Sequence, residues 1–185
     1  MEPKKITNIH KVLSVIPFAV EEIHFTPQGA ETETPYYRLQ SPDWVNVLPV
    51  TSDGRIILIE QYRVGSNRIT LETPGGTLNP DEKDPTMTAA RELEEETGFT
   101  SMRFLPLGSF NPNPAIMSNR CHFFIALGCQ FNSERKHFPD PGENIELKLF
   151  QPREIEDMVR FGQIDHALAA LCIMLGLKYL KGATP

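Results

Sequence analysis

Apolar and polar residues alternate along much of the chain in short runs, a pattern that is typical of β-strands. We expect strands at 44–50, 55–62, 68–72, 102–110, 121–131 and 147–150, and alternating patches predict two or three more within residues 1–40. Asp53-Gly54 predicts a hairpin turn between the first two of these strands. Residues 123–127 are all apolar, which predicts a strand that is buried on both faces.

Three other segments have the apolar spacing of helices, at 84–98, 152–161 and 165–182. In the first, Asp84 is a suitable N-cap, Pro85 a suitable first helical residue and Gly98 a suitable left-handed C-cap. Its expected apolar stripe is formed by Met87, Ala90 and Leu93. Strands mixed with three helices predict an α/β fold in which helices cover a sheet.

Composition narrows the classes of protein that the chain can belong to. Its 185 residues are 40% hydrophobic, enough for one domain of ordinary size, or one domain with a small extension. The net charge of −6 argues against a general nucleic-acid binder, which needs a basic surface. We expect no signal peptide and no membrane span, and three cysteines without metal-ligand spacing favour reduced, buried thiols. The expected location is therefore the cytoplasm.

The predicted helix at 84–98 carries candidate chemistry on one face. Glu92, Glu95 and Glu96 stand at positions i, i+3 and i+4, so their carboxylates share that face. Their repulsion favours a bound cation, and oxygen ligands without Cys or His suit Mg²⁺, with Mn²⁺ as a substitute. The alternative is an acidic face that is simply solvated, as most runs of glutamate are. Before the helix, Pro74-Gly75-Gly76 predicts a tight loop where the backbone can approach a ligand or a metal closely.

The stretch from Gly76 to Phe99, GTLNPDEKDPTMTAARELEEETGF, resembles the Nudix box, Gly-x5-Glu-x7-Arg-Glu-apolar-x-Glu-Glu-x-Gly-apolar. Eight residues rather than seven separate Glu82 from Arg91, and the extra one falls before the helix. Further similarity to the ADP-ribose pyrophosphatase branch of this family lies in three places outside the box: SPDWVNV at 41–47, EQYR at 60–63 and LETPGG at 71–76. The branch also has a proline about sixteen residues beyond the box, where this chain has Pro114.

This resemblance implies a Nudix-type α/β/α sandwich with a mixed sheet, formed by residues 41–185. Residues 1–40 would then be a small antiparallel β extension, which in this branch commonly contributes to a homodimer. The implied reaction is metal-dependent hydrolysis of the diphosphate of a nucleoside diphosphate sugar. ADP-ribose is the first expected substrate, with GDP-mannose and other such sugars next. The products would be a nucleoside monophosphate and a sugar phosphate.

Metal-binding roles follow for residues of the acidic helix and the loop before it. We assign Glu92 and Glu96 as direct ligands and Glu95 as a third, partly shared ligand, all on the face described above. By analogy with the family, the carbonyl of Gly75 completes a site. Arg91 is within i, i+4 reach of Glu95 and is expected to orient it.

Substrate contacts are expected from residues outside the helix. The resemblance places Arg63 on the diphosphate, with Arg68 as a weaker candidate, and a surface salt bridge is the alternative for both. Glu72 would meet a ribose hydroxyl or a metal, and Pro114 would shape a wall for the terminal sugar. Trp44 could stack on a base, although core packing in a strand is the favoured alternative for this residue.

A base for the attacking water is expected from the loop at 138–146, because metal-bound carboxylates are poor bases. The branch resemblance points to Glu143, with Glu146 as the second candidate. Two other functions stay open: a Nudix hydrolase of dinucleoside polyphosphates or nucleoside triphosphates, and a Nudix domain that senses nucleotides without turnover. The intact glutamates of the box argue against the second.

Overall fold

The computed structural model describes residues 6–26, 32–139 and 144–182. The chain forms two compact units. One unit contains the residues up to Asp43 together with Phe110–Arg120, and the other contains Trp44–Ser109 together with the chain from Cys121 onwards. The smaller unit thus joins segment 110–120 to the N-terminal strands.

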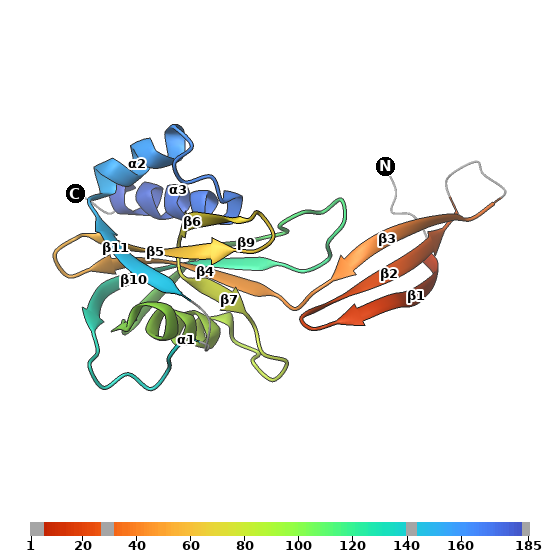
Figure 1. The fold of residues 1–185 in the computed structure, drawn as a ribbon, viewed down its shortest axis with the longest axis horizontal. Helices are drawn as coiled ribbons and strands as arrows, with labels where there is room; N and C mark the ends of the chain where they lie inside the picture. Colours follow the sequence, from red (N-terminus) through yellow and green to blue (C-terminus); the bar gives the residue numbers. More distant parts are fainter. Residues whose placement is uncertain (1–5, 27–31, 140–143, 183–185) are drawn as a thin grey trace. The chain divides into compact units, whose positions relative to one another are not determined.

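The larger unit is built on a mixed sheet (Figure 1). Its strands are β4 (Trp44–Thr51), β5 (Ile56–Arg63), β6 (Arg68–Glu72), β7 (Gly75–Thr77), β8 (Phe99–Thr100), β9 (Arg103–Phe110), β10 (Cys121–Phe131) and β11 (Ile145–Phe150). The main path runs β11-β5-β4-β10-β8, and β6, β7 and β9 pair with β5, β4 and β10 respectively. β4 and β10 run parallel, whereas β5 pairs antiparallel with β4, β6 and β11. All the strands expected in this part of the chain are present.

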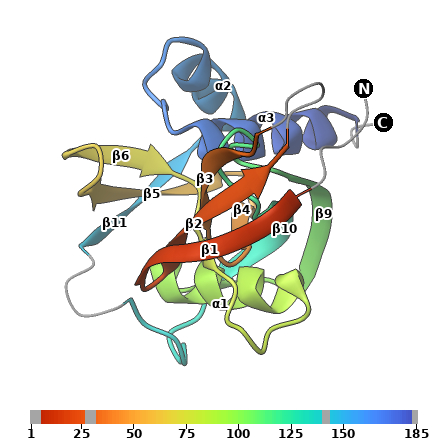
Figure 2. The ribbon, with the colours of Figure 1, turned by 90° about the vertical axis from the view of Figure 1, so that its right-hand side faces the viewer.

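Helices cover both faces of this sheet, as Figures 1 and 2 show. α1 (Pro85–Thr97) lies on one face, and α2 (Pro152–Arg160) and α3 (Ala167–Gly182) lie on the other. Along β10, Phe123 and Ile125 are buried toward α2 and α3, while Phe124 and Ala126 are buried toward α1. This alternation confirms both the strand that is buried on two faces and the α/β/α sandwich.

The caps of α1 are those that its sequence predicts. The Asp84 side chain accepts a hydrogen bond from the Thr86 amide, and Gly98 adopts the left-handed conformation with a φ of 73°. The expected apolar stripe was wrong in part, because Met87 is 65% exposed, whereas Ala89 and Leu93 are fully buried. Residues 89 and 93 also stand at i, i+4, and the small Ala89 allows the helix to pack closely on the sheet.

The predicted loop at Gly75-Gly76 is instead the short strand β7, which pairs antiparallel with the start of β4. Gly75 lies opposite Asn46, and a Cβ atom at Gly75 would overlap the backbone oxygen of Val45. The close approach expected at these glycines is therefore present, but strand pairing produces it. β7 consequently has a fixed position beside α1.

The smaller unit contains the antiparallel sheet β1-β2-β3, made of β1 (Ile6–Val15), β2 (Phe18–Phe25) and β3 (Thr34–Gln40). The backbone amide of Leu39 donates to the carbonyl of Ile116, and the Tyr36 hydroxyl donates to the carbonyl of Ala115. These bonds attach segment 110–120 to β3. Among the described residues of the chain, no helix has the length and apolar character needed to span a membrane.

Candidate active site

Three carboxylates converge on one guanidinium along α1. Arg91 Nη1 lies 2.8 Å from Glu92 Oε1 and 3.1 Å from Glu95 Oε2, and Arg91 Nε lies 3.5 Å from Glu82 Oε1. Burial alone would lower the pKa of Arg91, but the neighbouring carboxylates raise it above its ordinary value. Arg91 thus orients Glu95, as its i, i+4 spacing predicts, and is charged at every physiological pH.

Glu82 fixes the loop that contains the extra residue before α1. Its Oε2 accepts hydrogen bonds from the Asn79 amide at 2.9 Å and from Thr88 Oγ1 at 2.7 Å. Burial raises the pKa of Glu82, but these bonds and Arg91 outweigh it and hold the pKa below its ordinary value. The longer spacing between Glu82 and Arg91 is absorbed in this loop, because Asp84 still caps the helix and the acidic face is unchanged.

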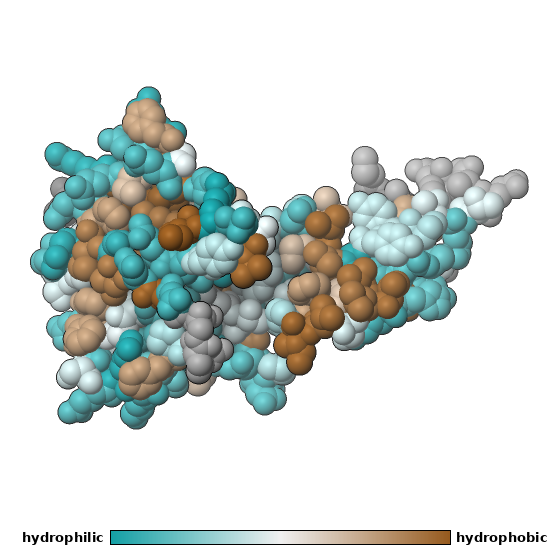
Figure 3. All heavy atoms as spheres, in the orientation of Figure 1, coloured by the Kyte–Doolittle hydropathy of each residue, from teal (hydrophilic) through white to brown (hydrophobic). Residues whose placement is uncertain are grey.

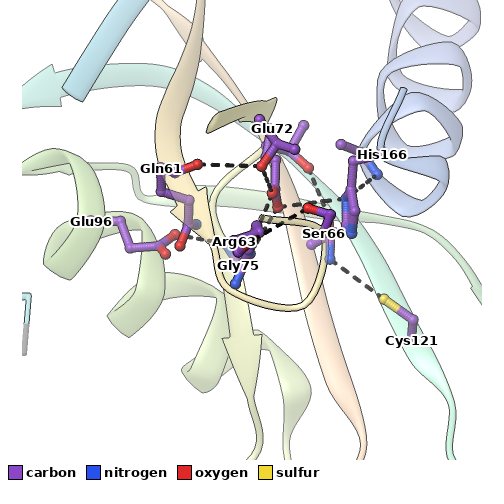
Figure 4. Close-up of polar contacts among 12 residues, drawn as sticks. Gln61, Arg63, Ser66, Glu72, Gly75, Glu96, Cys121 and His166 are labelled. Atoms are coloured by element: carbon purple, nitrogen blue, oxygen red, sulfur yellow. Dashed lines mark hydrogen bonds and ion pairs between the residues drawn. The ribbon is translucent and has the colours of Figure 1, made fainter. Parts of the chain in front are cut away.

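Strand β7 packs directly against this acidic face. The amide of Gly75 donates a hydrogen bond of 2.8 Å to Glu96 Oε2, which is drawn in Figure 4. A Cβ atom at Gly76 would overlap the carboxylate of Glu92. Both glycines are therefore needed for backbone and carboxylate to come this close.

A cavity of about 330 Å³ lies between β7 and the acidic face. Its lining residues are Gln61, Arg63, Gly75, Gly76, Thr77, Asn79, Arg91, Glu92, Glu95 and Glu96. Carboxylate and backbone oxygens of this kind are the ligands that a hard divalent cation prefers, so the donor set fits such an ion. Among the described residues, no group of three His, Cys, Asp or Glu side chains is placed to hold a metal ion, and the carboxylates of Glu92 and Glu95 pair with Arg91.

Arg63 and Glu72 form a doubly hydrogen-bonded ion pair behind this cavity (Figure 4). Arg63 Nε donates to Glu72 Oε1 and Arg63 Nη2 donates to Glu72 Oε2, each at 2.8 Å. Thr70 Oγ1 donates to Glu72 Oε1 at 2.5 Å. Burial raises the pKa of Glu72, but the bonds from Arg63 and Thr70 outweigh burial and lower the pKa overall. Glu72 is therefore ionised and holds Arg63 in a fixed orientation.

A second cavity, of about 470 Å³, adjoins the first and shares with it Arg63 and the three residues of β7. Trp44 lines this cavity and also packs against the core on the α3 side of the sheet. Arg68 lines it too, and its Nη2 lies 2.6 Å from Asp165 Oδ2. The structure thus brings Trp44, Arg63 and Arg68 together around a single cavity.

The remaining predicted site residues lie elsewhere. Glu72 is 2% exposed and lies behind Arg63 rather than on the lining of either cavity. Pro114 belongs to the smaller unit. The predicted base Glu143 lies outside the described residues, while the second candidate, Glu146, is an exposed residue of β11 that lies 3.0 Å from Lys148 Nζ.

Two lining residues of the larger cavity were missed by reasoning from the sequence. Asp165 and His166 directly precede α3 and come from about 100 residues beyond β6 in the chain. Their types and spacing give no local signal of a site, since an aspartate before a helix is an ordinary capping residue and a single histidine has no ligand spacing. The fold alone places them beside Arg63.

The family model described as NUDIX domain matches residues 41–169, which is most of the chain. The chain belongs to the Nudix family. It is therefore a Nudix hydrolase, and its acidic helix α1 is the helix of the Nudix box.

Relatives with assigned activities include several bacterial proteins. The chain is 32% identical to the ADP-ribose pyrophosphatase of Bacillus subtilis (strain 168) over 170 residues, covering 84% of this chain and 89% of the relative. It is 33% identical to the methanol dehydrogenase activator of Bacillus methanolicus over 114 residues, or 62% of this chain and 60% of the relative. It is 24% identical to the ADP compounds hydrolase NudE of Escherichia coli (strain K12) over 183 residues, which is 98% of this chain and 96% of the relative.

A crystal structure of an ADP compounds hydrolase matches the fold of this Nudix hydrolase with a TM-score of 0.83. The match covers 100% of this chain and 97% of the other, at 23% sequence identity. The likeness establishes the α/β fold and the small antiparallel N-terminal sheet.

Proposed function

We propose that this Nudix hydrolase cleaves the diphosphate linkage of nucleoside diphosphate sugars, with ADP-ribose as the first substrate. Hydrolysis would yield a nucleoside monophosphate and a sugar phosphate. The observation that carries the proposal is the pair of adjoining cavities that share Arg63 and β7. One has an acidic wall suited to a metal and a diphosphate, and the other, larger cavity has room for a nucleoside or a sugar.

The activities named for the relatives support this choice of substrate. The Bacillus subtilis relative is an ADP-ribose pyrophosphatase, and it aligns with this chain over 89% of its own length. The Escherichia coli relative is an ADP compounds hydrolase. Both names describe compounds in which a diphosphate joins adenosine to a second group, which agrees with a site made of two adjoining cavities.

The metal of the proposed reaction is Mg²⁺, with Mn²⁺ as a substitute. Glu92, Glu95 and Glu96 would hold it, together with the carbonyl of Gly75, at the acidic wall of the smaller cavity. A bound divalent ion neutralises diphosphate oxygens and lowers the pKa of a bound water. Arg91 keeps Glu92 and Glu95 on the cavity side of α1.

The chain's own residues position the diphosphate. Arg63 lines both cavities, so its guanidinium can bind diphosphate oxygens where the two cavities meet. Glu72 and Thr70 hold Arg63 from behind, which removes the cost of ordering its side chain when substrate binds. Glu143 is the proposed base for the attacking water, with Glu146 as the alternative.

The decisive test is turnover of a panel of nucleoside diphosphate sugars with Mg²⁺, followed by chromatography of the nucleoside monophosphate. Glu96→Gln keeps an oxygen for the Gly75 amide but removes the charge, so we expect turnover to fall by about 100-fold or more. Glu156→Gln is the matched control, because Glu156 lies on α2 and pairs with Lys181. Turnover of dinucleoside polyphosphates or nucleoside triphosphates instead of the sugars would reject the proposed substrate.

We further propose that residues 1–40 form the dimerisation element of a homodimer. Apolar side chains gather on the surface of the N-terminal sheet (Figure 3). Those on β1 and at the start of β2 include Ile9, Val12, Leu13 and Phe18, which are 42–59% exposed. Burying such side chains against a second copy would be favourable. Sedimentation equilibrium should give twice the chain mass of 20.9 kDa, and a monomer at micromolar concentration would reject the dimer.

A further inference from the structure

His166 occupies the N-cap position of α3 and also lines the larger cavity. Its Nδ1 lies 3.3 Å from the backbone nitrogen of Ala169 and accepts the hydrogen bond of that amide. This is the bond that an N-cap side chain makes to the third residue of a helix. The same Nδ1 is 3.5 Å from Glu72 Oε2, which is too long for a hydrogen bond.

The capping bond decides which nitrogen carries the proton. A neutral imidazole has one donor nitrogen and one acceptor nitrogen, so a ring that accepts at Nδ1 is protonated at Nε2. The contacts of the His166 ring with the residues that the structure describes are all made by Nδ1. The ring therefore has an N–H donor at Nε2, and His166 is one of the residues that line the cavity.

The neighbouring side chain of Asp165 supplies an acceptor at the same place. Its Oδ2 pairs with Arg68, and a carboxylate has acceptor capacity for several hydrogen bonds. A donor and an acceptor side by side match a hydroxyl group, which can accept one hydrogen bond and donate another. A phosphate oxygen, which mainly accepts, would be repelled by Asp165.

We propose that His166 is a specificity-determining residue that donates a hydrogen bond from Nε2 to a sugar hydroxyl of the substrate, while Asp165 accepts from that hydroxyl. The inference rests on the proposed function, because the cavity adjoins the diphosphate site through Arg63 and β7. The hydroxyl belongs either to the ribose of the nucleoside or to the second sugar, and the two share the same chemistry.

The test separates capping from substrate binding by comparing two variants. His166→Ser keeps a hydroxyl that can accept from the Ala169 amide, but it removes the Nε2 donor. His166→Ala removes both, so its melting temperature should fall by about 2–4 °C while that of the serine variant stays close to the wild type. Both variants should lose about three- to tenfold in kcat/KM for ADP-ribose, mainly through a higher KM.

Analogues of ADP-ribose that each lack one hydroxyl identify the bonded group. On the analogue that lacks the bonded hydroxyl, the wild type and His166→Ser should have the same kcat/KM. The hydroxyl that is missing from this analogue tells which sugar occupies the cavity. A serine variant that matches the wild type on ADP-ribose would overturn the proposal. An equal loss on every analogue would also overturn it, because His166 would then act through Glu72 and Arg63.

Failure of the proposed function is distinguishable from failure of this inference. If the wild type hydrolyses no nucleoside diphosphate sugar, the proposed function fails whatever the variants do. Calorimetric binding of ADP-ribose in EDTA, where no turnover occurs, then decides on His166 alone. Weaker binding by His166→Ser than by the wild type supports the inference, and equal affinity or no binding by either protein rejects it.

Discussion

The guanidinium of Arg63 is clamped by two hydrogen bonds to Glu72, a carboxylate that is 2% exposed although the Arg63 side chain is 44% exposed. The pair thus joins the core to the cavities, because its negative end is buried and its positive end lines both cavities. Under the proposed function, Arg63 would both bind the diphosphate and hold β5 to β6.

Removing either end of this pair should have different effects. Glu72→Gln keeps the shape but removes the charge, so we expect a loss of about 1–3 kcal/mol in the free energy of unfolding. Arg63→Lys keeps a charge but loses the two-pronged geometry, so kcat/KM should fall because the group is less well oriented. Urea unfolding and turnover of ADP-ribose measure the two effects. A Glu72→Gln variant as stable as the wild type would show that the pair contributes nothing to folding.

The same pair predicts a pH dependence of stability. The pKa of Glu72 is lowered in the folded protein relative to its ordinary value of 4.5. Its contribution is therefore fully present above pH 4.5 and is lost as the pH falls through the lower, folded pKa. The stability difference between wild type and Glu72→Gln should shrink on acidification below that value. Urea unfolding at a series of pH values measures it, and a constant difference would contradict the assignment.

Gly76→Ala should impair catalysis by displacing a carboxylate of the acidic face. The added Cβ would overlap the Glu92 carboxylate, so this side chain must move away from β7. We expect a loss of turnover and a higher Mg²⁺ concentration for half-maximal activity, with the fold intact by circular dichroism. Gly182→Ala is the control, since a Cβ there meets open space. Wild-type metal dependence in Gly76→Ala would show that the position of Glu92 is unimportant.

The choice between the two candidate bases can be tested directly. A general base typically contributes a factor of about 100 or more, so Glu143→Gln should lower kcat by at least that factor while KM changes little. Glu146→Gln should be close to wild type, because Glu146 is exposed and its neighbour is Lys148. The reverse order of the two kcat values would transfer the role to Glu146.

Glu94 of α1 contacts residues 132–137, the segment that directly follows β10. Glu94 Oε1 lies 3.2 Å from Asn132 Nδ2 and 3.3 Å from the Lys136 amide, and Glu94 Oε2 lies 3.6 Å from His137 Nε2. Because Glu94→Ala removes these contacts, amide hydrogen exchange should accelerate across 132–137 and stay unchanged in β4. Unchanged exchange in 132–137 would show that other contacts hold this segment.

The helices and strands could be predicted from residues that are close in sequence, whereas the site is formed by residues that are far apart in the chain. The caps of α1 could be predicted because Asp84 and Gly98 act on their own helix, and the two-sided burial of β10 could be predicted from residues 123–127. Met87 was misplaced because it was linked to Leu93 through Ala90 by two steps of i, i+3, and these two steps together turn about 120° around the helix.

Contacts between residues that are far apart in the chain could not be predicted from nearby sequence. Arg63 could be matched to a family motif, but its pairing with Glu72 depends on how β5 and β6 lie side by side. His166 reaches the same cavity from the start of α3, and nothing near it in sequence indicates a ligand. The sequence therefore predicted the acidic helix and part of the larger cavity, but not Asp165 or His166 on its lining.

The contact between α3 and the sheet at Gly176 makes the shape of the pocket adjustable from a distance. A Cβ at Gly176 would overlap the side chain of Leu48 on β4, so a larger residue there requires either this side chain or the helix to shift. His166 begins the same rigid helix, ten residues earlier and about 15 Å along its axis. Under the proposed function, a methyl group at position 176 that displaced α3 would also displace His166 in the larger cavity. Substrate choice would then change although every residue that lines this cavity stays the same.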